Sequence, residues 1–476
     1  MQKDKKNDAV DILLVWPPIE NYFSAAVPSI GLAYLAAVLE PHYNVRILEC
    51  NNEGMYSADA VIEYIRKMKP RVAGFHLATL CVPCTEEIVK ALKEDDECPV
   101  FLAGGPHASA LPAETLDTGI DYIAIGEAEA TIVELMDYIC GKPNALSPDD
   151  IESIAFKRDG QTVITNKRKL LDVNTLPYPA WHLFNKEDYS GALRKTDKIL
   201  PVMSSRGCPE SCTFCYKEIF GTSIRFRNPK DVVDEIEYLK DTFQIEQFAI
   251  LDENFTLSKK HAMEFCNLLI ERDLNLGWYL GNGVRVDSTD EEVIAIMKKA
   301  GNYRIALGVD SGNDDILKEL KKRITKEQAR NAVAVYKKYG YEITTFFLIG
   351  APSETKQTVQ DTIDFAIELN PDIATFNNLT PLPGSELYKY YDAKGDLLTK
   401  DWRHYNYFYY KDRDPVYNHP TLTWDELRKL RTKAYRKFYF RFGYVFSQFR
   451  RLKSFSDFTL LLKKAFTFLG FMKTNL

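Results

Sequence analysis

The feature that most constrains the fold of this chain is a regular alternation of short apolar runs with amphipathic helical patterns. Within residues 1–142, strand-like runs occur at Asp11–Val15, Asn44–Leu48, Val72–Ala78, Val100–Ala103 and Tyr122–Ile125. Helical patterns occur at Ser29–Leu39, Glu86–Leu92 and Glu127–Ile139. Strands that alternate with helices predict βαβ units and a parallel sheet. We therefore expect residues 1–142 to form a doubly wound, Rossmann-like α/β domain that binds its ligand at the carboxyl ends of its strands.

A second block of the same alternation covers residues 198–395. Its strand-like runs are Val202–Ser204, Gln247–Leu251, Leu280–Val284, Ile305–Val309, Thr344–Ile349 and Ile373–Asn377. Amphipathic helical patterns such as Pro229–Thr242 and Lys259–Arg272 lie between them. Six βα repeats in this length predict a barrel-like sheet, here a partial (β/α)6 barrel.

The stretch between the two blocks, residues 143–197, is expected to be a linker. Within it, Ser153–Phe156 and Thr162–Thr165 flank an Asp159-Gly160 turn. An Asp-Gly pair between two strand-like runs predicts a short hairpin.

The C-terminal region, residues 396–476, has a helical pattern that is rich in basic and aromatic residues. From Thr421 to Leu476 there are thirteen Lys or Arg residues against three acids, together with fourteen aromatic residues. Such a segment can pack on the mouth of a barrel, contact an anionic membrane or a lipidic substrate, or bind nucleic acid. We favour packing, and we consider nucleic acid the weakest of the three.

The overall composition is that of a soluble globular protein. The net charge is −6, with 45% hydrophobic and 27% charged residues, which excludes a collagen-like or wholly disordered chain. No run of ~18 apolar residues predicts a membrane span, and the polar N-terminus lacks a secretory signal. Nine cysteines are an odd number, so we expect no disulfide framework. A cytoplasmic location follows, with membrane contact restricted to the C-terminal region.

The strongest chemical signal is Cys208-Pro-Glu-Ser-Cys212-Thr-Phe-Cys215, which directly follows a strand-like run. Three thiolates at this spacing can hold one polynuclear metal site without help from another segment. A four-iron cube bound by three cysteines keeps one iron open for a non-protein ligand. Zinc would need a fourth ligand nearby, and three unrelated buried thiols remain the plainest alternative.

This motif, with the Tyr216 that follows it, closely resembles that of the radical S-adenosylmethionine (SAM) enzymes. The resemblance implies a 4Fe-4S cluster held by Cys208, Cys212 and Cys215. Its open iron would chelate the amino and carboxylate groups of SAM. An external one-electron donor of the flavodoxin or ferredoxin type would reduce the cluster, which then cleaves SAM to a 5′-deoxyadenosyl radical.

Segments that follow the later strands resemble SAM-binding segments of the same family, although each could by itself be a structural turn. The resemblance assigns to SAM the residues Asp252, Glu253, Arg285, Asp310, Ser311, Gly350 and Pro352. The two acids would bind the SAM ammonium, Arg285 the ribose or carboxylate, and the turn at Gly350 the adenine.

The first domain has neither a G-x-G-x-x-G fingerprint nor a Walker loop. It resembles the cobalamin-binding domain that precedes many radical SAM enzymes. The resemblance assigns to cobalamin the residues Pro18, Ser29, Gly31, Gly104, Gly105, His107, Gly126 and Glu127. Where histidine-ligating cobalamin proteins carry Asp-x-His-x-x-Gly, this chain has Glu49–Gly54 without histidine, so that cobalt ligand is absent.

Two other features of the first domain are given structural roles. His76 lies on a neighbouring strand and is interpreted as a core residue rather than as an axial ligand. Cys81 and Cys84 form a C-x2-C pair without a partner pair, and we interpret them as packing thiols.

These resemblances identify the chain as a cobalamin-dependent radical SAM C-methyltransferase that acts on an unactivated carbon. The aromatic C-terminal region favours a large apolar substrate, such as a bacteriochlorophyllide or an isoprenoid lipid. The nearest alternative is an anaerobic oxidative cyclase of a magnesium porphyrin ester. A tRNA methylthiotransferase and a non-catalytic cobalamin sensor are alternatives of other classes.

Overall fold

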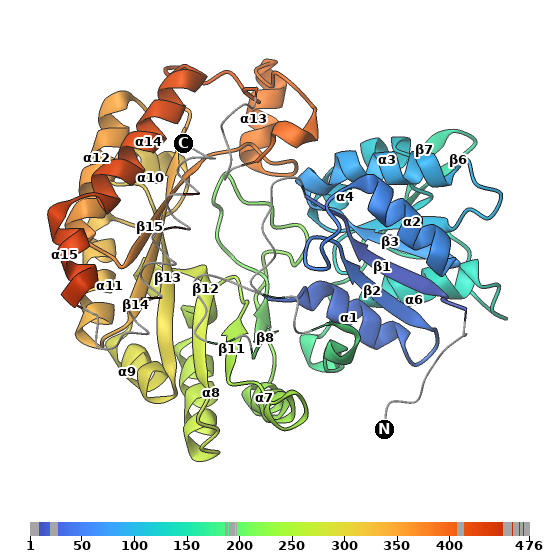
Figure 1. Cartoon of the computed structure of the whole chain (residues 1–476), viewed down its shortest axis with the longest axis horizontal. Helices are drawn as coiled ribbons and strands as arrows, with labels where there is room; N and C mark the ends of the chain where they lie inside the picture. The colour runs from blue at the N-terminus through green and yellow to red at the C-terminus, as the bar shows by residue number, and fades with distance from the viewer. Residues whose placement is uncertain are drawn as a thin grey trace. The chain divides into compact units, whose positions relative to one another are not determined.

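The computed structural model describes residues 9–19, 27–185, 189, 196, 198–406, 414–450, 459, 466 and 470. These residues divide into two compact units (Figure 1). The first unit lies within Met1–Gly191, Tyr216–Ser223 and Asp401–Arg403, and the second lies within Ala192–Cys215, Ile224–Lys400 and His404–Leu476. The predicted helical pattern beyond Arg450 lies outside the described residues, apart from Thr459, Phe466 and Gly470.

In its described part, the first unit contains a seven-stranded sheet with the order β2-β1-β3-β4-β5-β6-β7. The first five strands are parallel, as predicted, and comprise β1 (Ile12–Trp16), β2 (Val45–Glu49), β3 (Val72–His76), β4 (Val100–Gly104) and β5 (Tyr122–Ala124). The helices are α1 (Ile30–Leu39), α2 (Ala58–Met68), α3 (Val82–Leu92), α4 (Pro106–Ala110), α5 (Pro112–Asp117) and α6 (Glu129–Ile139). The doubly wound α/β fold is thereby confirmed.

The predicted hairpin does not stand apart in a linker. Strands β6 (Ile154–Arg158) and β7 (Gln161–Ile164) pair antiparallel around the Asp159-Gly160 turn, and β6 pairs with β5. The hairpin therefore extends the sheet of the first unit, because buried Ile154 and Ala155 of β6 add to its core.

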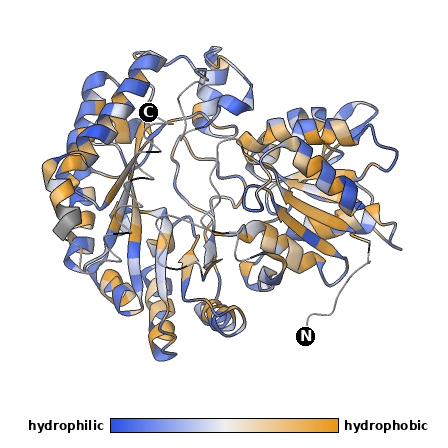
Figure 2. Ribbon diagram, viewed as in Figure 1, coloured by the Kyte–Doolittle hydropathy of each residue, from blue (hydrophilic) through white to orange (hydrophobic). Residues whose placement is uncertain are grey.

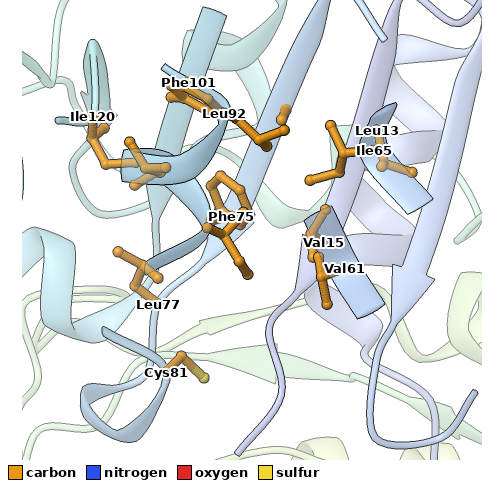
Figure 3. Packing of buried hydrophobic residues seen from close by; sticks show 14 of the residues in the cluster. Leu13, Val15, Val61, Ile65, Phe75, Leu77, Cys81, Leu92, Phe101 and Ile120 are labelled. Carbon is orange, nitrogen blue, oxygen red and sulfur yellow. The ribbon is translucent and has the colours of Figure 1, made fainter. Parts of the chain in front are cut away.

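The core of the first unit is a cluster of apolar side chains from the strands and the covering helices (Figure 3). Phe75 lies in the middle and stacks on Phe101 with ring centroids 6.2 Å apart. Val61 and Ile65 reach this core from α2, a helix that the sequence reading did not predict. Cys81 is also fully buried in it, in agreement with a packing role.

The second unit contains an all-parallel sheet of six described strands in the order β15-β14-β13-β12-β11-β8. They are β8 (Ile199–Val202), β11 (Gln247–Ile250), β12 (Gly277–Arg285), β13 (Asn302–Asp310), β14 (Glu342–Ile349) and β15 (Ile373–Asn378). A short antiparallel pair, β9 (Ser205–Arg206) and β10 (Arg225–Phe226), follows β8. Five of the six predicted strands coincide with strands of this sheet, whereas the first lies earlier than predicted, at Ile199–Val202 instead of Val202–Ser204. An open sheet with this order is the expected partial barrel.

Helices cover the outer side of this sheet (Figure 1). They are α7 (Pro229–Phe243), α8 (Lys259–Glu271), α9 (Glu291–Lys299), α10 (Asp314–Glu319), α11 (Lys326–Lys338) and α12 (Lys356–Leu369). After β15 the chain continues with α13 (Glu386–Lys394), α14 (Trp424–Tyr439) and α15 (Phe442–Arg450). Figure 2 shows helices that are hydrophobic on one side and hydrophilic on the other, as expected for amphipathic helices packed on a buried sheet. None of the helices in the described part of the chain has the length and apolarity needed to cross a bilayer.

The edge of this open sheet is covered by α14. Arg431 donates from Nε to the carbonyl of Phe376 in β15 (2.8 Å). The Tyr435 hydroxyl accepts from the Phe376 amide (3.2 Å), and the Tyr439 hydroxyl bonds both the amide and the carbonyl of Ala374 (3.1 and 2.9 Å). Residues spaced by four share one helix face, so α14 satisfies backbone groups that an edge strand would otherwise expose. In the described tail, these side chains serve packing.

Candidate functional site

The cysteine loop follows β8 and is held by the segments beside it. The amide of Thr213 donates to the carbonyl of Leu320 (3.1 Å), and the carbonyl of Thr213 accepts from the Leu387 amide (2.9 Å). Cys208 and Cys212 are partly buried, Cys215 is exposed, and none of the three forms a disulfide. The loop is therefore anchored at its centre, with its thiols at the carboxyl end of the parallel sheet.

The two acids after β11 have different roles. The Asp252 carboxylate is buried and accepts from the amide and hydroxyl of Ser204 (2.7 and 2.6 Å) and from the Ser205 hydroxyl (2.7 Å). Burial raises the pKa of Asp252 in spite of these bonds. Asp252 thus ties the end of β11 to the end of β8, where the cysteine loop begins.

Glu253 is the acid that remains for a ligand. Its Oε2 is buried and has no hydrogen-bond partner among the described residues. Burial, and then the charge of Asp252, raise the pKa of Glu253 to about 7. The nearby backbone of Gly207, directly before Cys208, opposes this rise in the pKa of Glu253, so the carboxylate lies beside the thiol loop. A ligand ammonium here would supply the missing partner and favour the charged carboxylate.

A buried network of ion pairs lies at the ends of β12 and β13. Arg285 donates to Asp287 from Nε and Nη2 (2.9 and 2.6 Å), and its Nη1 lies 3.2 Å from Oε2 of Glu210 in the cysteine loop. Asp310, in a left-handed backbone conformation (φ 64°), pairs with Lys322 (2.7 Å). Both predicted residues, Arg285 and Asp310, thus lie near the loop, but each is engaged with protein partners.

The remaining predicted SAM residues form turns. Ser311 is buried, with its hydroxyl 3.1 Å from that of Thr362 on α12, which indicates a packing role. Gly350 follows β14 with φ 112°, where a Cβ would approach the Tyr417 hydroxyl to 2.7 Å. The amides of Gly350 and Ala351 donate to the buried Glu354 carboxylate.

Burial raises the pKa of Glu354 to about 7. Both amides donate to Oε2 of Glu354, and its Oε1 has no partner among the described residues. Pro352 lies in this turn and is partly exposed.

The three thiols of one loop, with the Glu253 carboxylate beside them, suit a 4Fe-4S cluster with SAM. Within the described ranges, no group of three or more His, Cys, Asp or Glu side chains is arranged to hold one metal ion. In a 4Fe-4S cube each thiolate binds a different iron, which suits three thiols spread along one loop. The buried, unpartnered oxygen of Glu253 beside them suits the SAM ammonium.

In the first unit, the predicted residues gather around the carboxyl ends of the parallel strands. Pro18 is buried after β1, and Ser29 caps α1 through its hydroxyl (3.3 Å to the Leu32 amide). The Ser29 amide donates to Glu49 at the end of β2 (2.8 Å), and Tyr189 also donates to this carboxylate. The segment without histidine therefore fixes the start of α1, while Gly31 is exposed in its first turn.

Glycines leave room for backbone turns at the ends of β4 and β5. Gly104 ends β4 itself, with the Ala124 carbonyl 3.6 Å from where its Cβ would stand. Gly105 has φ 96°, and a Cβ there would approach His76 Nδ1 to 3.0 Å. Gly126 has φ 79°, and its amide donates to the Ser109 hydroxyl (3.0 Å). The Glu127 carboxylate accepts from the Leu171 amide (3.1 Å), so Glu127 holds the chain after the hairpin.

His107 is the predicted cobalamin residue with unused bonding capacity. It is buried, its Nδ1 lies 3.3 Å from the Thr79 hydroxyl, and its Nε2 has no partner among the described residues. Its ring meets Trp402 edge-on at 4.9 Å, and Trp402 donates to Glu114 (2.7 Å). Burial lowers the pKa of His107 to about 4, so the ring is neutral. A neutral imidazole with one open nitrogen, beside glycine turns, fits a bulky uncharged ligand surface such as a corrin edge.

Comparisons with known proteins agree with this arrangement. Residues 202–366 match the radical SAM superfamily, and residues 22–136 match the B12 binding domain. An uncharacterized methyltransferase of Pyrococcus horikoshii is 32% identical over 440 residues, which cover 90% of this chain and 92% of that protein.

A cytidylyl-2-hydroxyethylphosphonate methyltransferase of Streptomyces wedmorensis is 29% identical, with 76% of this chain and 77% of that protein covered. An anaerobic magnesium-protoporphyrin IX monomethyl ester cyclase of Rubrivivax gelatinosus is 28% identical, with 97% and 83% covered.

The radical SAM methyltransferase TsrM from Kitasatospora setae, solved with tryptophan and a SAM analogue, shares the fold. Its TM-score is 0.69 at 19% identity, and the match covers 88% of each chain. The cofactors of this chain are a 4Fe-4S cluster, SAM and cobalamin. The chain thus belongs to the B12-binding radical SAM enzymes, in their methyltransferase branch.

Proposed function

We propose that this chain is a C-methyltransferase, in which a methyl group of SAM reaches an unactivated carbon of the substrate by way of methylcobalamin. One observation carries the proposal. A thiol loop with an adjacent unpartnered carboxylate occurs in the same chain as a B12-binding domain. When bound, the cofactors supply the radical and the methyl group.

The residues of this chain bind and position. Cys208, Cys212 and Cys215 would hold the cluster, and Glu253 would accept hydrogen bonds from the SAM ammonium. Asp252 keeps the strand ends together beneath the loop. Glu354 keeps the Gly350 turn in place for the adenine.

The test is anaerobic reconstitution with iron, sulfide and cobalamin, followed by turnover with methyl-labelled SAM. Methyl label in the product supports transfer. Product without label supports the second candidate, oxidative cyclisation, which is favoured by the similarity to the porphyrin ester cyclase over 97% of this chain.

Iron counting addresses the methylthiotransferase alternative. About four irons per chain are expected for a single cluster, and about eight for a methylthiotransferase with two. A cobalamin sensor would keep its response in a Cys212→Ala variant, whereas the enzyme would lose SAM cleavage.

For the substrate we propose a large apolar molecule, of the tetrapyrrole or isoprenoid class. Support comes from aromatic side chains near the C-terminus that packing leaves exposed, since Phe440 is 56% and Phe442 85% exposed. A direct test is SAM cleavage measured with a porphyrin ester, an isoprenoid lipid and a polar nucleotide conjugate. Stimulation by the polar conjugate alone would exclude the apolar class.

The same region has a face suited to an anionic lipid surface. One side of α14 forms a groove of about 410 Å³, lined by Arg428, Lys429, Thr432, Lys433, Arg436 and Lys437. Exposed Phe442 and Phe446 follow it, and basic residues beside exposed aromatics favour anionic bilayers. We expect sedimentation with vesicles of anionic lipid and not with vesicles of neutral lipid, and loss of this difference in a Lys433→Glu/Lys437→Glu variant. Equal sedimentation with both would contradict lipid contact.

A further inference from the structure

The second unit contains a buried lysine that the sequence reading did not single out. Lys322 follows α10, and its side chain is 9% exposed. Its Nζ lies 2.9 Å from the position that a Cβ on Gly308 would occupy, so the bare backbone of β13 makes room for the ammonium. An ammonium is costly to bury without compensation, which points to a specific role.

The first partner of this ammonium is Asp310, at 2.7 Å. Asp310 is 6% exposed, so the pair is withdrawn from solvent on both sides. The backbone of the same segment is fixed as well, because Arg285 donates from Nη1 to the Lys322 carbonyl (2.9 Å).

The segment that carries Lys322 is also hydrogen-bonded to the cysteine loop. The amide of Thr213, next to Cys212, donates to the carbonyl of Leu320, two residues before Lys322. Although burial opposes the charged form, the charges of Asp310 and Cys212 raise the pKa of Lys322. Lys322 thus pairs with a buried carboxylate and lies on a segment that is hydrogen-bonded to the loop of the cysteines that we assign to the cluster.

We propose that Lys322 and Asp310 are a positioning pair that sets the reduction potential of the cluster held by Cys208, Cys212 and Cys215. The step concerned is the transfer of one electron from the external flavodoxin-type or ferredoxin-type donor to the oxidised cluster, with no bond made or broken. A nearby cation favours the added negative charge, and the paired carboxylate moderates this effect. The inference rests on the proposed cluster site.

If the pair sets the reduction potential of the cluster, substitutions of Asp310 and of Lys322 should shift this potential in opposite directions. Asp310→Asn leaves the cation uncompensated, and asparagine tolerates the left-handed backbone there. At a fixed potential it should raise the ratio of reduced to oxidised cluster about tenfold, which is ~59 mV for one electron. Lys322→Met should lower that ratio about threefold or more, and Lys322→Arg should restore it to within twofold.

Lys321→Met is the matched control. Lys321 is the neighbouring residue and also forms an ion pair, with Glu386 at 2.7 Å, but its side chain is 48% exposed. Loss of its charge should change the ratio less than twofold, because solvent screens it.

The measurement is a potentiometric titration of the reconstituted full-length protein without SAM, followed by electron paramagnetic resonance. A series in which Asp310→Asn and Lys322→Met shift in the same direction, or not at all, overturns the inference. If Lys322→Met loses its cluster, Asp310→Asn decides alone, since only an upward shift supports the pair. A wild-type protein that takes up no cluster would instead refute the proposed site itself.

Discussion

The carboxyl ends of the two parallel sheets differ in chemistry. The six-stranded sheet ends in buried charged groups around the thiol loop, including the Lys322–Asp310 pair and the Glu253 carboxylate. In the seven-stranded sheet, β4 and β5 end in glycine turns beside neutral His107, and buried Glu49 at the end of β2 is already engaged by Ser29 and Tyr189. Fixed charges suit a small charged ligand such as SAM and a redox cluster. Glycine turns and a neutral imidazole suit the large surface of a corrin. Single substitutions should therefore affect the binding of SAM and the binding of cobalamin separately.

The largest expected effect is on the charged end alone. Cys212→Ala removes one of three cluster thiolates, and we expect loss of the cluster and a decrease of at least about 1000-fold in SAM cleavage. Cobalamin binding, followed by absorption of the bound cofactor, should be unchanged.

Cys98→Ala is the control for that variant, because Cys98 is an exposed free thiol of the first unit. It should retain both cofactors. Loss of cobalamin in Cys212→Ala would show that the two ends are not independent.

The next prediction divides the two acids after β11. Glu253→Gln keeps the shape but loses the charge that an ammonium needs, so we expect SAM affinity to fall about 10- to 100-fold without a change in Tm. Isothermal titration on the reconstituted protein measures the affinity.

Asp252→Ala should behave in the opposite way. It leaves Ser204 and Ser205 without their acceptor and should lower the free energy of unfolding by about 3 kcal/mol. If both variants lost SAM affinity and stability to the same extent, Glu253 and Asp252 would not have the separate roles of binding SAM and of stabilising the fold.

The sequence predicts the strands better than it predicts the site. The strands of the six-stranded sheet and the first five strands of the first unit lie at or beside the apolar runs that predict them, because burial on both faces requires such runs. The placement of Glu253 follows from its position after a strand. The sequence could not predict that Asp252 is engaged within the protein while Glu253 has an oxygen left for a ligand, since this depends on the hydrogen bonds of Asp252 with Ser204 after another strand.

Other features depend on contacts between distant segments. Lys322 pairs with Asp310 only because a loop after α10 returns to the end of β13. The sequence favours packing for the aromatic and basic C-terminal region without saying where, and in the structure Arg431, Tyr435 and Tyr439 cover the edge of β15. Whether a strand lies at the edge of a sheet depends on the arrangement of all its strands, so no local sequence pattern predicts which strand needs to be covered.

A smaller effect is expected at the uncharged end. His107→Phe keeps the ring against Trp402 but removes the open Nε2, and we expect cobalamin affinity to fall about tenfold. Iron content and SAM affinity should be unchanged. If this variant bound cobalamin as tightly as the wild type, His107 would have a packing role and no contact with the cofactor.

The two ends are also expected to differ in the pH dependence of stability. Burial raises the pKa of Glu354 to about 7, so between about pH 4.5 and 7 the folded chain binds more protons than the unfolded chain. The contribution of Glu354 to stability therefore falls as the pH rises through this window, by up to about 1.4 kcal/mol per pH unit.

The His107 contribution has the opposite sign. Because the folded pKa is about 4 and the unfolded value is about 6.5, the unfolded chain binds the extra proton, and stability is lost as the pH falls through this range. Thermal unfolding of the apo-protein from pH 4.5 to 8 should show Glu354→Gln gaining on wild type toward high pH. His107→Phe should gain on wild type toward low pH. The glutamine keeps an oxygen for the amides of Gly350 and Ala351, so a constant difference at every pH would mean that the loss is one of packing and not of charge.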